Sequence, residues 1–245
     1  MTLVMQLSDN DVHLYLAPLT ATASQEQVLL DTLSDDERKR AARFINPLHQ
    51  QRFVIAHGQL RMLLGDYLTC APSLISFSTR SHQKPCLADQ HDDPLQFNLS
   101  HSEDHAAFAF TRIGDIGIDI ESIQADPKLD VANRFFSEEE RVSLSALPSA
   151  EQATAFYQLW SRKEAIIKAN GKGLSQPLNS FSVALTNEAE TVHLNDEQWS
   201  LYPLSLHPSF ASALAVQQPI QRLFIWDIIE QEPVFRCAIN PTITL

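Results

Sequence analysis

The order of the predicted elements repeats between the two halves of this chain of 245 residues. Each half reads as a strand, a capped helix, a longer helix and then several strands. The segment HAAFAFT at 105–111 resembles FASALAV at 210–216, and residues 52–65 resemble residues 155–168 in outline. A weak internal repeat of this kind predicts an α+β fold with two lobes of about equal size.

We expect the two lobes to meet near residue 114. The N-terminal lobe should then span residues 1–113, and the C-terminal lobe should span residues 114–216. Residues 217–245 remain as a C-terminal tail, which contains an apolar stretch at 223–229.

Capping and terminating residues place the helices. The first helix should end before Pro47, a second should follow to Leu68, and the last long helix should end at Gly171. Capping patterns, Ser followed three residues later by Glu or Gln, occur at 34–37, 137–140 and 149–152. The predicted strands are 11–18 (half-buried), 75–79, 96–99, 106–111, 116–121, 181–185, 198–204 and 212–216.

Composition limits the classes of protein that this chain can be. The formal net charge of −12 argues against a nucleic-acid partner, because polyanions require basic surfaces. The three cysteines, Cys70, Cys86 and Cys237, include no C-x-x-C pair, which indicates free thiols in a reducing compartment. The N-terminus lacks the features of a signal peptide, and residues 198–221 are interrupted by prolines, so no membrane span is predicted. We therefore expect a cytoplasmic protein.

The segment Gly117-Ile118-Asp119-Ile120-Glu121 alternates strictly between apolar and acidic residues. On a strand the isoleucines point to one face, and Asp119 and Glu121 point to the other, roughly 7 Å apart. Two carboxylates at that spacing can share a hard cation such as Mg²⁺. The alternative is the solvent-facing side of an edge strand.

A second acidic position lies in the last long helix. Glu164 and Lys168 are separated by four residues and share one helix face, and Trp160 lies one turn before Glu164. Because Trp160 indicates a buried or half-buried face, this pair is expected in a cleft. The alternative is a surface ion pair of little energetic value.

Two further segments offer groups that could bind an anion. His101 lies between Ser100 and Ser102, which is either a set of hydrogen-bond donors or an ordinary polar turn. A serine hydrolase is not supported, since no G-x-S-x-G occurs and adjacent residues could not easily act as nucleophile and base. The pair Lys84-Pro85 adds a cation on a loop. A basic run without acidic residues contains Arg38, Lys39, Arg40, Arg43, Arg52 and Arg61.

Four motifs, in this order and spacing, resemble those of the Sfp-type 4′-phosphopantetheinyl transferases. They are NLSHS at 98–102, GIDIE at 117–121, RFFS at 134–137 and WSRKEAIIKANGKGL at 160–174. The resemblance covers about residues 34–185. The last motif is highly specific when it is paired with GIDIE upstream.

The resemblance implies a pseudo-dimer of two similar α+β lobes, with coenzyme A in the cleft between them. It implies transfer of 4′-phosphopantetheine from coenzyme A to a serine of an apo carrier protein, with release of adenosine 3′,5′-bisphosphate. The metal ligands that it implies are Asp119, Glu121 and Glu164, and the catalytic residues are Glu164 and Lys168. The residues that it places at coenzyme A are Arg40, Arg52, Lys84, Pro85, Ser100, His101, Lys163 and Lys168.

The residue types suit this chemistry. Oxygen ligands favour Mg²⁺, and Mn²⁺ would suit the same site. Lys168 could donate to the leaving oxygen or neutralise it, and Glu164 could accept the serine proton directly or through a metal-bound water. Two other functions stay open: a carrier-binding module without catalysis, and a metal-dependent diphosphate hydrolase.

The predicted partner is an acyl or peptidyl carrier protein, bound by a monomer without nucleic acid or membrane. Such carriers are expected to be acidic, so docking on this acidic chain requires a local basic or apolar surface. The candidate is Arg134-Phe135-Phe136, although one phenylalanine is expected in the core.

Overall fold

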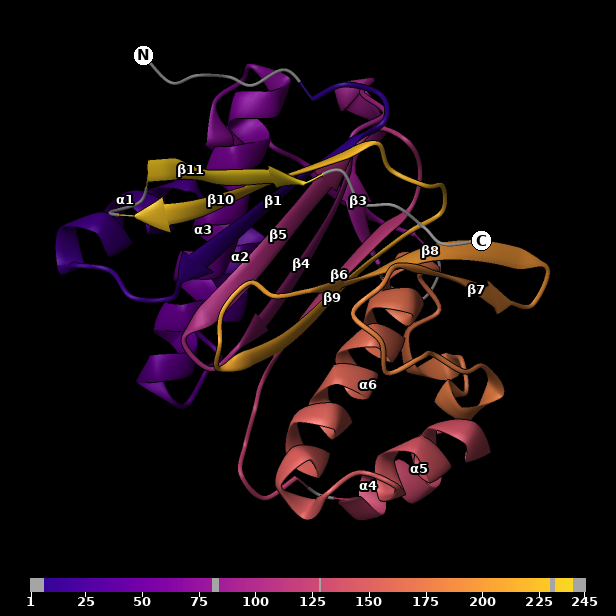
Figure 1. Cartoon of the computed structure of the whole chain (residues 1–245). Helices are drawn as coiled ribbons and strands as arrows, with labels where there is room; N and C mark the ends of the chain where they lie inside the picture. Colours follow the sequence, from indigo (N-terminus) through magenta and orange to yellow (C-terminus); the bar gives the residue numbers. More distant parts are fainter. Residues whose placement is uncertain (1–6, 81–83, 128, 230–231, 240–245) are drawn as a thin grey trace.

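The computed structural model describes residues 7–80, 84–127, 129–229 and 232–239 (Figure 1). The elements of the first half are β1 (Asp11–Pro18), α1 (Ala23–Thr32), α2 (Asp35–Ala41), α3 (Pro47–Leu68), β2 (Phe77–Thr79), β3 (Pro85–Leu87), β4 (Gln96–Ser102) and β5 (His105–Thr111). The elements of the second half are β6 (Ile116–Ser122), α4 (Leu129–Phe135), α5 (Glu138–Ser145), α6 (Ser149–Ala169), β7 (Glu190–Leu194), β8 (Glu197–Leu204), β9 (Phe210–Val216), β10 (Arg222–Ile229) and β11 (Glu232–Ile239).

The strands form two main sheets and a small hairpin. The first sheet has the order β11-β10-β1-β5-β4, the second has the order β6-β9-β8-β7, and β2 pairs with β3. Strand β1 is parallel to β10 and antiparallel to β5. The C-terminal tail thus completes the sheet of the first half.

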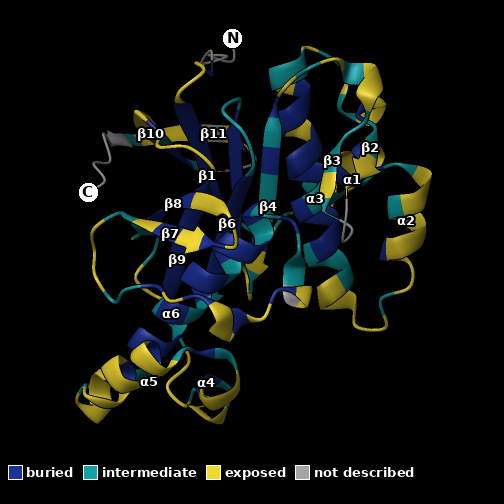
Figure 2. Cartoon of the chain, turned by 90° about the vertical axis from the view of Figure 1, so that its right-hand side faces the viewer, coloured by how far each residue is buried: buried dark blue, intermediate teal, exposed yellow. Residues whose placement is uncertain are grey.

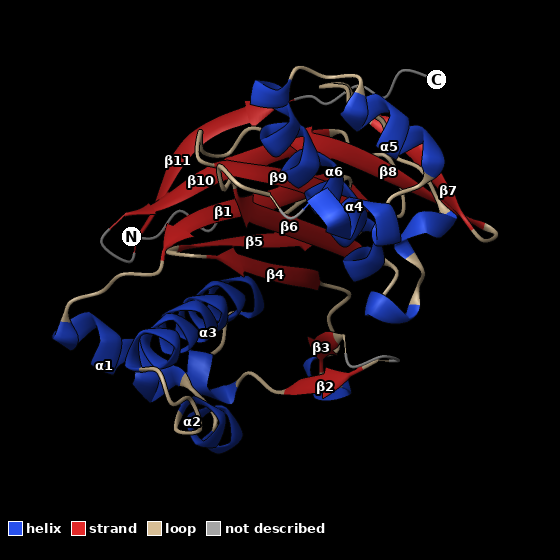
Figure 3. Cartoon of the chain, turned by 90° about the horizontal axis from the view of Figure 1, so that it is seen from below, coloured by secondary structure: helices blue, strands red, loops and turns tan. Residues whose placement is uncertain are grey.

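The two sheets pack face to face between two long helices, as the view in Figure 3 shows. Alternate residues of β1 (Val12, Leu14) share an apolar core with Ile118 and Ile120 of β6, and this core joins the sheets. The opposite face of the first sheet packs on α3, and the opposite face of the second packs on α6. Strand β1 is therefore buried on both faces, and the expectation of a half-buried strand is wrong.

The α+β architecture and most predicted elements are confirmed. Ser34 and Ser137 form the capping boxes that their sequences predict. At the start of α6, however, Pro148 is the N-cap and no side chain caps the helix. The strand expected at 181–185 is absent from the structure. The backbone N–H groups of that loop bond to side chains instead, as in Val183 to Glu140.

Two α-helices, α1 and α4, were not anticipated. Thr22 and Gln25 form a capping box that begins α1. Within the described ranges, no helix combines the length and apolar character that crossing a bilayer requires. The three cysteines are free thiols, as the sequence predicts.

Candidate active site

The two sheets meet along a seam between the edge strands β4 and β6, which lie side by side in Figure 1. Polar side chains at alternate positions of β4 occupy the seam and accept hydrogen bonds from alternate backbone N–H groups of β6. The pairs are Asn98 with Ile118 (2.9 Å), Ser100 with Ile120 (3.3 Å) and Ser102 with Ser122 (2.9 Å).

This ladder gives Asn98 and Ser102 a role that the sequence analysis missed. Their signal is the spacing N-x-S-x-S, which puts three polar side chains on one face of a strand. The same spacing directs His101 to the other face of β4. The side chains of Ser100 and His101 therefore point to opposite faces of β4, although the two residues are adjacent in sequence.

The seam also orients the two carboxylates of β6. The Ser100 hydroxyl donates to Asp119 Oδ1 at 3.0 Å, and the Ser102 hydroxyl donates to Glu121 Oε2 at 3.4 Å. Asp119 is only 1% exposed, and its Oδ2 has no hydrogen-bond partner in the structure. A buried carboxylate oxygen without a partner is costly, so this atom calls for a cation.

Helix α6 brings the third carboxylate, Glu164, and Lys168 close to Asp119. It packs directly on β6 at Gly117, where a Cβ atom would lie 2.2 Å from the Ala165 carbonyl oxygen. The Lys168 ammonium then lies 2.6 Å from Asp119 Oδ1 and 2.8 Å from the Ser100 hydroxyl. The glycine is therefore required for the close approach that assembles the site.

The carboxylates of this cluster influence one another strongly. Burial raises the pKa of Glu121 to about 7, and the negative charges of Asp119 and Glu164 add to the shift against the opposing charge of Lys168. Burial and Asp119 likewise raise the pKa of Glu164 to about 7. Two glutamates that resist ionisation beside the buried Asp119 form with it a donor set for a hard cation.

The cluster is not arranged as a finished metal site. In the part of the chain that the structure describes, no three His, Cys, Asp or Glu side chains converge on one point. The Lys168 ammonium lies against Asp119 instead. The unpaired Asp119 Oδ2 and the raised pKa values of Glu121 and Glu164 nevertheless fit a divalent ion.

Cationic groups gather on the other side of β4. His101 lies at the surface, but its ring is partly shielded from water, and this burial lowers its pKa. Neighbouring positive charges lower it further, and they belong to Lys168, His57, Arg52 and Arg40. An electropositive surface thus adjoins the carboxylate cluster.

Only part of the basic run contributes to this surface. Arg61 is buried and pairs with Glu37 at 2.7 Å, while Lys39 pairs with Asp36 at 3.2 Å. Burial alone would raise the pKa of Glu37, but hydrogen bonds from His57 and Ser34 and the charge of Arg61 lower it to about 2. Glu37 is therefore an anchor of α2 on α3.

Arg40 and Arg52 remain available on that surface. The Arg40 guanidinium carbon lies 5.1 Å from the centre of the Phe53 ring, and Arg52 makes only a long contact of 3.5 Å to Glu103. Within the described part of the chain, neither arginine forms an ion pair with a buried carboxylate.

The Lys84 ammonium is bonded within the protein. Its ammonium donates to the Ala169 carbonyl at 2.7 Å, the Ile116 carbonyl at 3.1 Å and Asp115 Oδ1 at 3.4 Å. A lysine has three N–H donors, and all three have protein acceptors. This corrects the prediction that the Lys84 ammonium binds the cosubstrate. The adjacent Pro85 is exposed.

Lys163 is also absent from the cluster. It is fully buried on another face of α6 and pairs with Glu140 at 2.7 Å. Its remaining donors bond to the carbonyl oxygens of Leu178 at 2.8 Å and Phe181 at 2.6 Å. The prediction that Lys163 contacts the cosubstrate is wrong, because a buried and fully bonded ammonium cannot reach a ligand.

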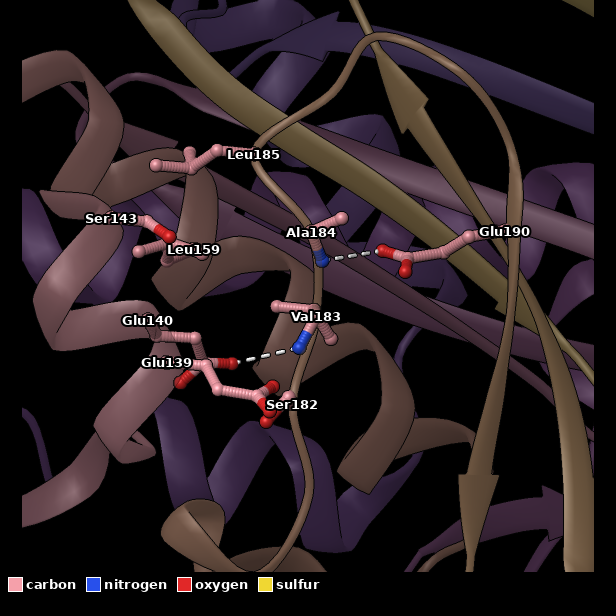
Figure 4. A pocket seen from close by; sticks show the side chains of 9 residues that line it. All are labelled: Glu139, Glu140, Ser143, Leu159, Ser182, Val183, Ala184, Leu185 and Glu190. Carbon is pink, nitrogen blue, oxygen red and sulfur yellow. Dashed lines mark hydrogen bonds between the residues drawn. The ribbon is translucent and has the colours of Figure 1, made fainter.

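A cavity of about 320 Å³ lies elsewhere, between α5, α6 and the loop before β7 (Figure 4). Glu140 and Glu190 point toward this loop and accept hydrogen bonds from the backbone N–H groups of Val183 and Ala184. No residue of the carboxylate cluster lines the cavity. Its acidic side chains hold a loop in place, and the chemistry is concentrated at the seam.

Comparisons with known proteins match both halves of the chain. A family model described as "4′-phosphopantetheinyl transferase, N-terminal" matches residues 20–112. A second, described as "4′-phosphopantetheinyl transferase superfamily", matches residues 115–215.

Individual relatives agree with the family models. The chain is 37% identical to the 4′-phosphopantetheinyl transferase HetI of Nostoc sp., over 86% of this chain and 90% of that protein. It is 38% identical to the 4′-phosphopantetheinyl transferase Sfp of Bacillus subtilis, over 76% of this chain and 88% of that protein. It is 32% identical to the 4′-phosphopantetheinyl transferase AcpT of Escherichia coli O157:H7, over 64% and 78% respectively.

Proposed function

The chain belongs to the 4′-phosphopantetheinyl transferase superfamily and is a transferase, and on that premise we propose that it transfers 4′-phosphopantetheine from coenzyme A to a serine of an apo carrier protein. The observation that carries the proposal is that Asp119, Glu121 and Glu164 influence one another electrostatically at the seam, where Lys168 bonds to Asp119. Phosphoryl transfer from a diphosphate requires such a combination of cation ligands and a positive charge.

The three carboxylates would hold the divalent ion, Mg²⁺ or Mn²⁺. When bound, this ion neutralises charge on the diphosphate of coenzyme A. The orphaned Asp119 Oδ2 and the raised pKa values of the two glutamates support this assignment.

The chain's own residues would then act as follows. The carrier serine oxygen bonds to the phosphorus that carries pantetheine, and the bond from that phosphorus to the leaving oxygen breaks, which releases adenosine 3′,5′-bisphosphate. Glu164, directly or through a bound water, accepts the serine proton. Lys168 stabilises the charge that develops on the leaving phosphate.

Recognition of coenzyme A belongs to the electropositive surface. His101 would contact the diphosphate, and Arg40 and Arg52 would contact the 3′-phosphate. Ser100, which was predicted to bind coenzyme A, has its hydroxyl fully bonded to Asp119, Lys168 and the Ile120 N–H, so its role is to position these groups. Burial lowers the pKa of His101, and the positive charges around it lower this pKa further; those charges support an anion at that position. Pro85 is exposed and offers an apolar contact for the adenine.

The partner in this proposal is an acyl or peptidyl carrier protein, and the transferase acts as a cytoplasmic monomer. Three free thiols support a reducing compartment. The division into residues 1–113, 114–216 and a tail 217–245 is also proposed, and the two sheets support its first boundary.

The test is a mass-shift assay with apo carrier protein, coenzyme A and Mg²⁺. Transfer adds roughly 340 Da to the carrier, which is the mass of the phosphopantetheinyl group. A carrier-binding module without catalysis would leave the carrier mass unchanged. A diphosphate hydrolase would consume coenzyme A without modifying the carrier.

A further inference from the structure

The Lys84 side chain connects the two halves of the molecule through hydrogen bonds. Lys84 directly precedes β3 in the first half, yet every acceptor of its ammonium lies in the second half. Only 9% of its side chain is exposed. The contact therefore belongs to the interior of the interlobe boundary and not to its surface.

The two backbone acceptors, the carbonyl groups of Ala169 and Ile116, lie next to elements of the site. Ala169 is the last residue of α6 and follows Lys168 directly, while Ile116 is the first residue of β6, three residues before Asp119. The carbonyl groups of a last helical turn have no partners within the helix and carry its negative dipole end. An ammonium at this position satisfies such a carbonyl and ties it to the start of the metal strand.

The helix terminus is built to receive this side chain. Gly171 ends α6 with a positive φ of 72°, and a Cβ atom there would lie 3.3 Å from the Lys84 Cδ. A side chain at this position would be strained by the backbone and would crowd the lysine stem. Gly171 thus ends α6 and leaves room for Lys84.

We propose that Lys84 is a positioning residue that pins the end of α6 to the start of β6 and thereby sets Lys168 against Asp119. This inference rests on the proposed function, because it assigns a role within the transfer reaction. Loss of the pin leaves α6 packed on β6 at Gly117 but frees its last turn, which carries Lys168. Small displacements of reacting groups can lower a rate about 100-fold.

Arg80 provides a matched control. It pairs with Asp115 at 2.6 Å, as Lys84 does at 3.4 Å, but its side chain is 45% exposed, and among the described residues no hydrogen bond or ion pair joins it to α6. The substitutions Lys84→Met and Arg80→Met therefore both remove a cation from Asp115. Only Lys84→Met removes the link between Ala169 and Ile116.

The experiment measures transfer rates and coenzyme A affinity for the wild type, Lys84→Met and Arg80→Met. We expect Lys84→Met to lower kcat about 10- to 100-fold, with an equilibrium Kd for coenzyme A within about threefold of the wild type, which is less than 1 kcal/mol. Arg80→Met should keep both values. Lys84→Arg retains a cation within reach of the carbonyls and should restore part of kcat.

Two results would overturn the assignment. The first is an unchanged kcat in Lys84→Met. The second is a weaker Kd for coenzyme A with kcat retained at saturation, which would make Lys84 a ligand contact. If Lys84→Met does not fold, the kcat values of Lys84→Gln and Lys84→Arg are compared instead. Equal kcat values of these two variants would contradict the positioning role of the Lys84 ammonium. A wild type without transfer activity would instead reject the proposed function.

Discussion

Ser100 uses every hydrogen-bonding position of its hydroxyl group. It donates to Asp119 and accepts from the Ile120 N–H and from Lys168. A hydroxyl group has one donor and two acceptor positions, so none is left over. One residue of β4 thereby joins the two sheets and fixes both a carboxylate and the lysine of the site.

Asp119 is the residue on which most of these contacts converge. The isosteric change Asp119→Asn keeps the shape of the side chain but removes the charge that a divalent ion and Lys168 require. We expect transfer to fall by about 100-fold or more, and the thermal melting temperature to stay near that of the wild type or to rise. The mass-shift assay and a melting curve measure both. Transfer near the wild-type rate in EDTA-treated buffer would contradict the role of Asp119.

The glutamates of the cluster predict how stability depends on pH. Folding raises the pKa of Glu121 and Glu164 from 4.5 to about 7, so the folded protein holds these protons more tightly than the unfolded chain. The free energy of unfolding of the metal-free protein should therefore fall as the pH rises from 4.5 through 7.

A divalent ion must displace the same protons, so its stabilising effect should grow in the opposite direction. We expect Mg²⁺ to raise the melting temperature more at pH 8 than at pH 6, and Glu164→Gln to reduce this difference. Melting curves with Mg²⁺ and with EDTA at both pH values provide the measurement. An equal Mg²⁺ effect at both values would contradict the prediction.

At the scale of elements, α6 presents different chemistry on different faces. Lys163 and Lys168 are five residues apart, which is about 140° around a helix. Both lysines fall in the sequence motif, but only Lys168 faces β6. The motif alone predicted both as ligands of the cosubstrate. Helix geometry could have separated the two lysines, although it could not have identified Glu140 as the partner of Lys163.

The buried pair of Lys163 and Glu140 joins α6 to α5 and to the loop that contains Phe181. Lys163→Met would leave the Glu140 carboxylate buried without its counter-ion. We expect a loss of about 3–5 kcal/mol in the free energy of unfolding, since breaking one partner of a buried pair is strongly destabilising.

Urea denaturation measures this loss, with Lys39→Met as the control because Lys39 forms an exposed ion pair. A Lys163→Met variant that loses less than about 1 kcal/mol would show that the pair is dispensable. The coenzyme A affinity of any folded Lys163→Met protein should match that of the wild type.

Helices α2 and α3 carry the electropositive surface. Arg40→Ala and Arg52→Ala should each weaken coenzyme A binding several-fold, and the loss should shrink as salt is added. Neither change should affect binding of 3′-dephospho-coenzyme A. Lys39→Ala is the matched control on α2, because Lys39 pairs with Asp36. If each arginine variant binds coenzyme A and 3′-dephospho-coenzyme A as tightly as the wild type does, this surface is an ordinary solvated helix face.

At the scale of the whole molecule, the sequence predicts the local elements better than their assembly. The capping boxes at Ser34 and Ser137 formed because they depend on neighbouring residues. The pairing of β1 with β10 joins Asp11 to Arg222, and no local pattern indicates a partner so distant in sequence. The ladder of β4 on β6 was missed for the same reason, although its polar residues are visible in the sequence.

The charge of the whole chain limits where an acidic carrier protein could dock. With a net charge of −12, the molecule repels an acidic partner at long range. Helix α4 offers a contrasting surface, and its outer face is exposed in Figure 2. Arg134 is exposed above the Phe135 ring at 5.0 Å, and Leu129 is 40% exposed, whereas Phe136 belongs to the core.

This surface adjoins the site through Trp160. Phe135 packs edge-on against the Trp160 ring at 5.7 Å, and Trp160 lies one helical turn before Glu164. A carrier that docks on α4 would therefore present its serine near the proposed base. The arrangement supports the docking role that the sequence predicts for Arg134.

Arg134→Glu reverses the charge without disturbing the buried Phe136. We expect the apparent KM for an acidic carrier protein to rise several-fold at low salt, with the KM for coenzyme A unchanged, because like charges across an interface reduce affinity. Added salt should narrow the difference, since it screens exposed charges beyond about 8–10 Å. Arg141→Glu is the matched control, because Arg141 lies on the neighbouring helix α5 and pairs with Glu138. If both reversals change the carrier KM equally, only the net charge matters, and if neither changes it, the carrier docks elsewhere.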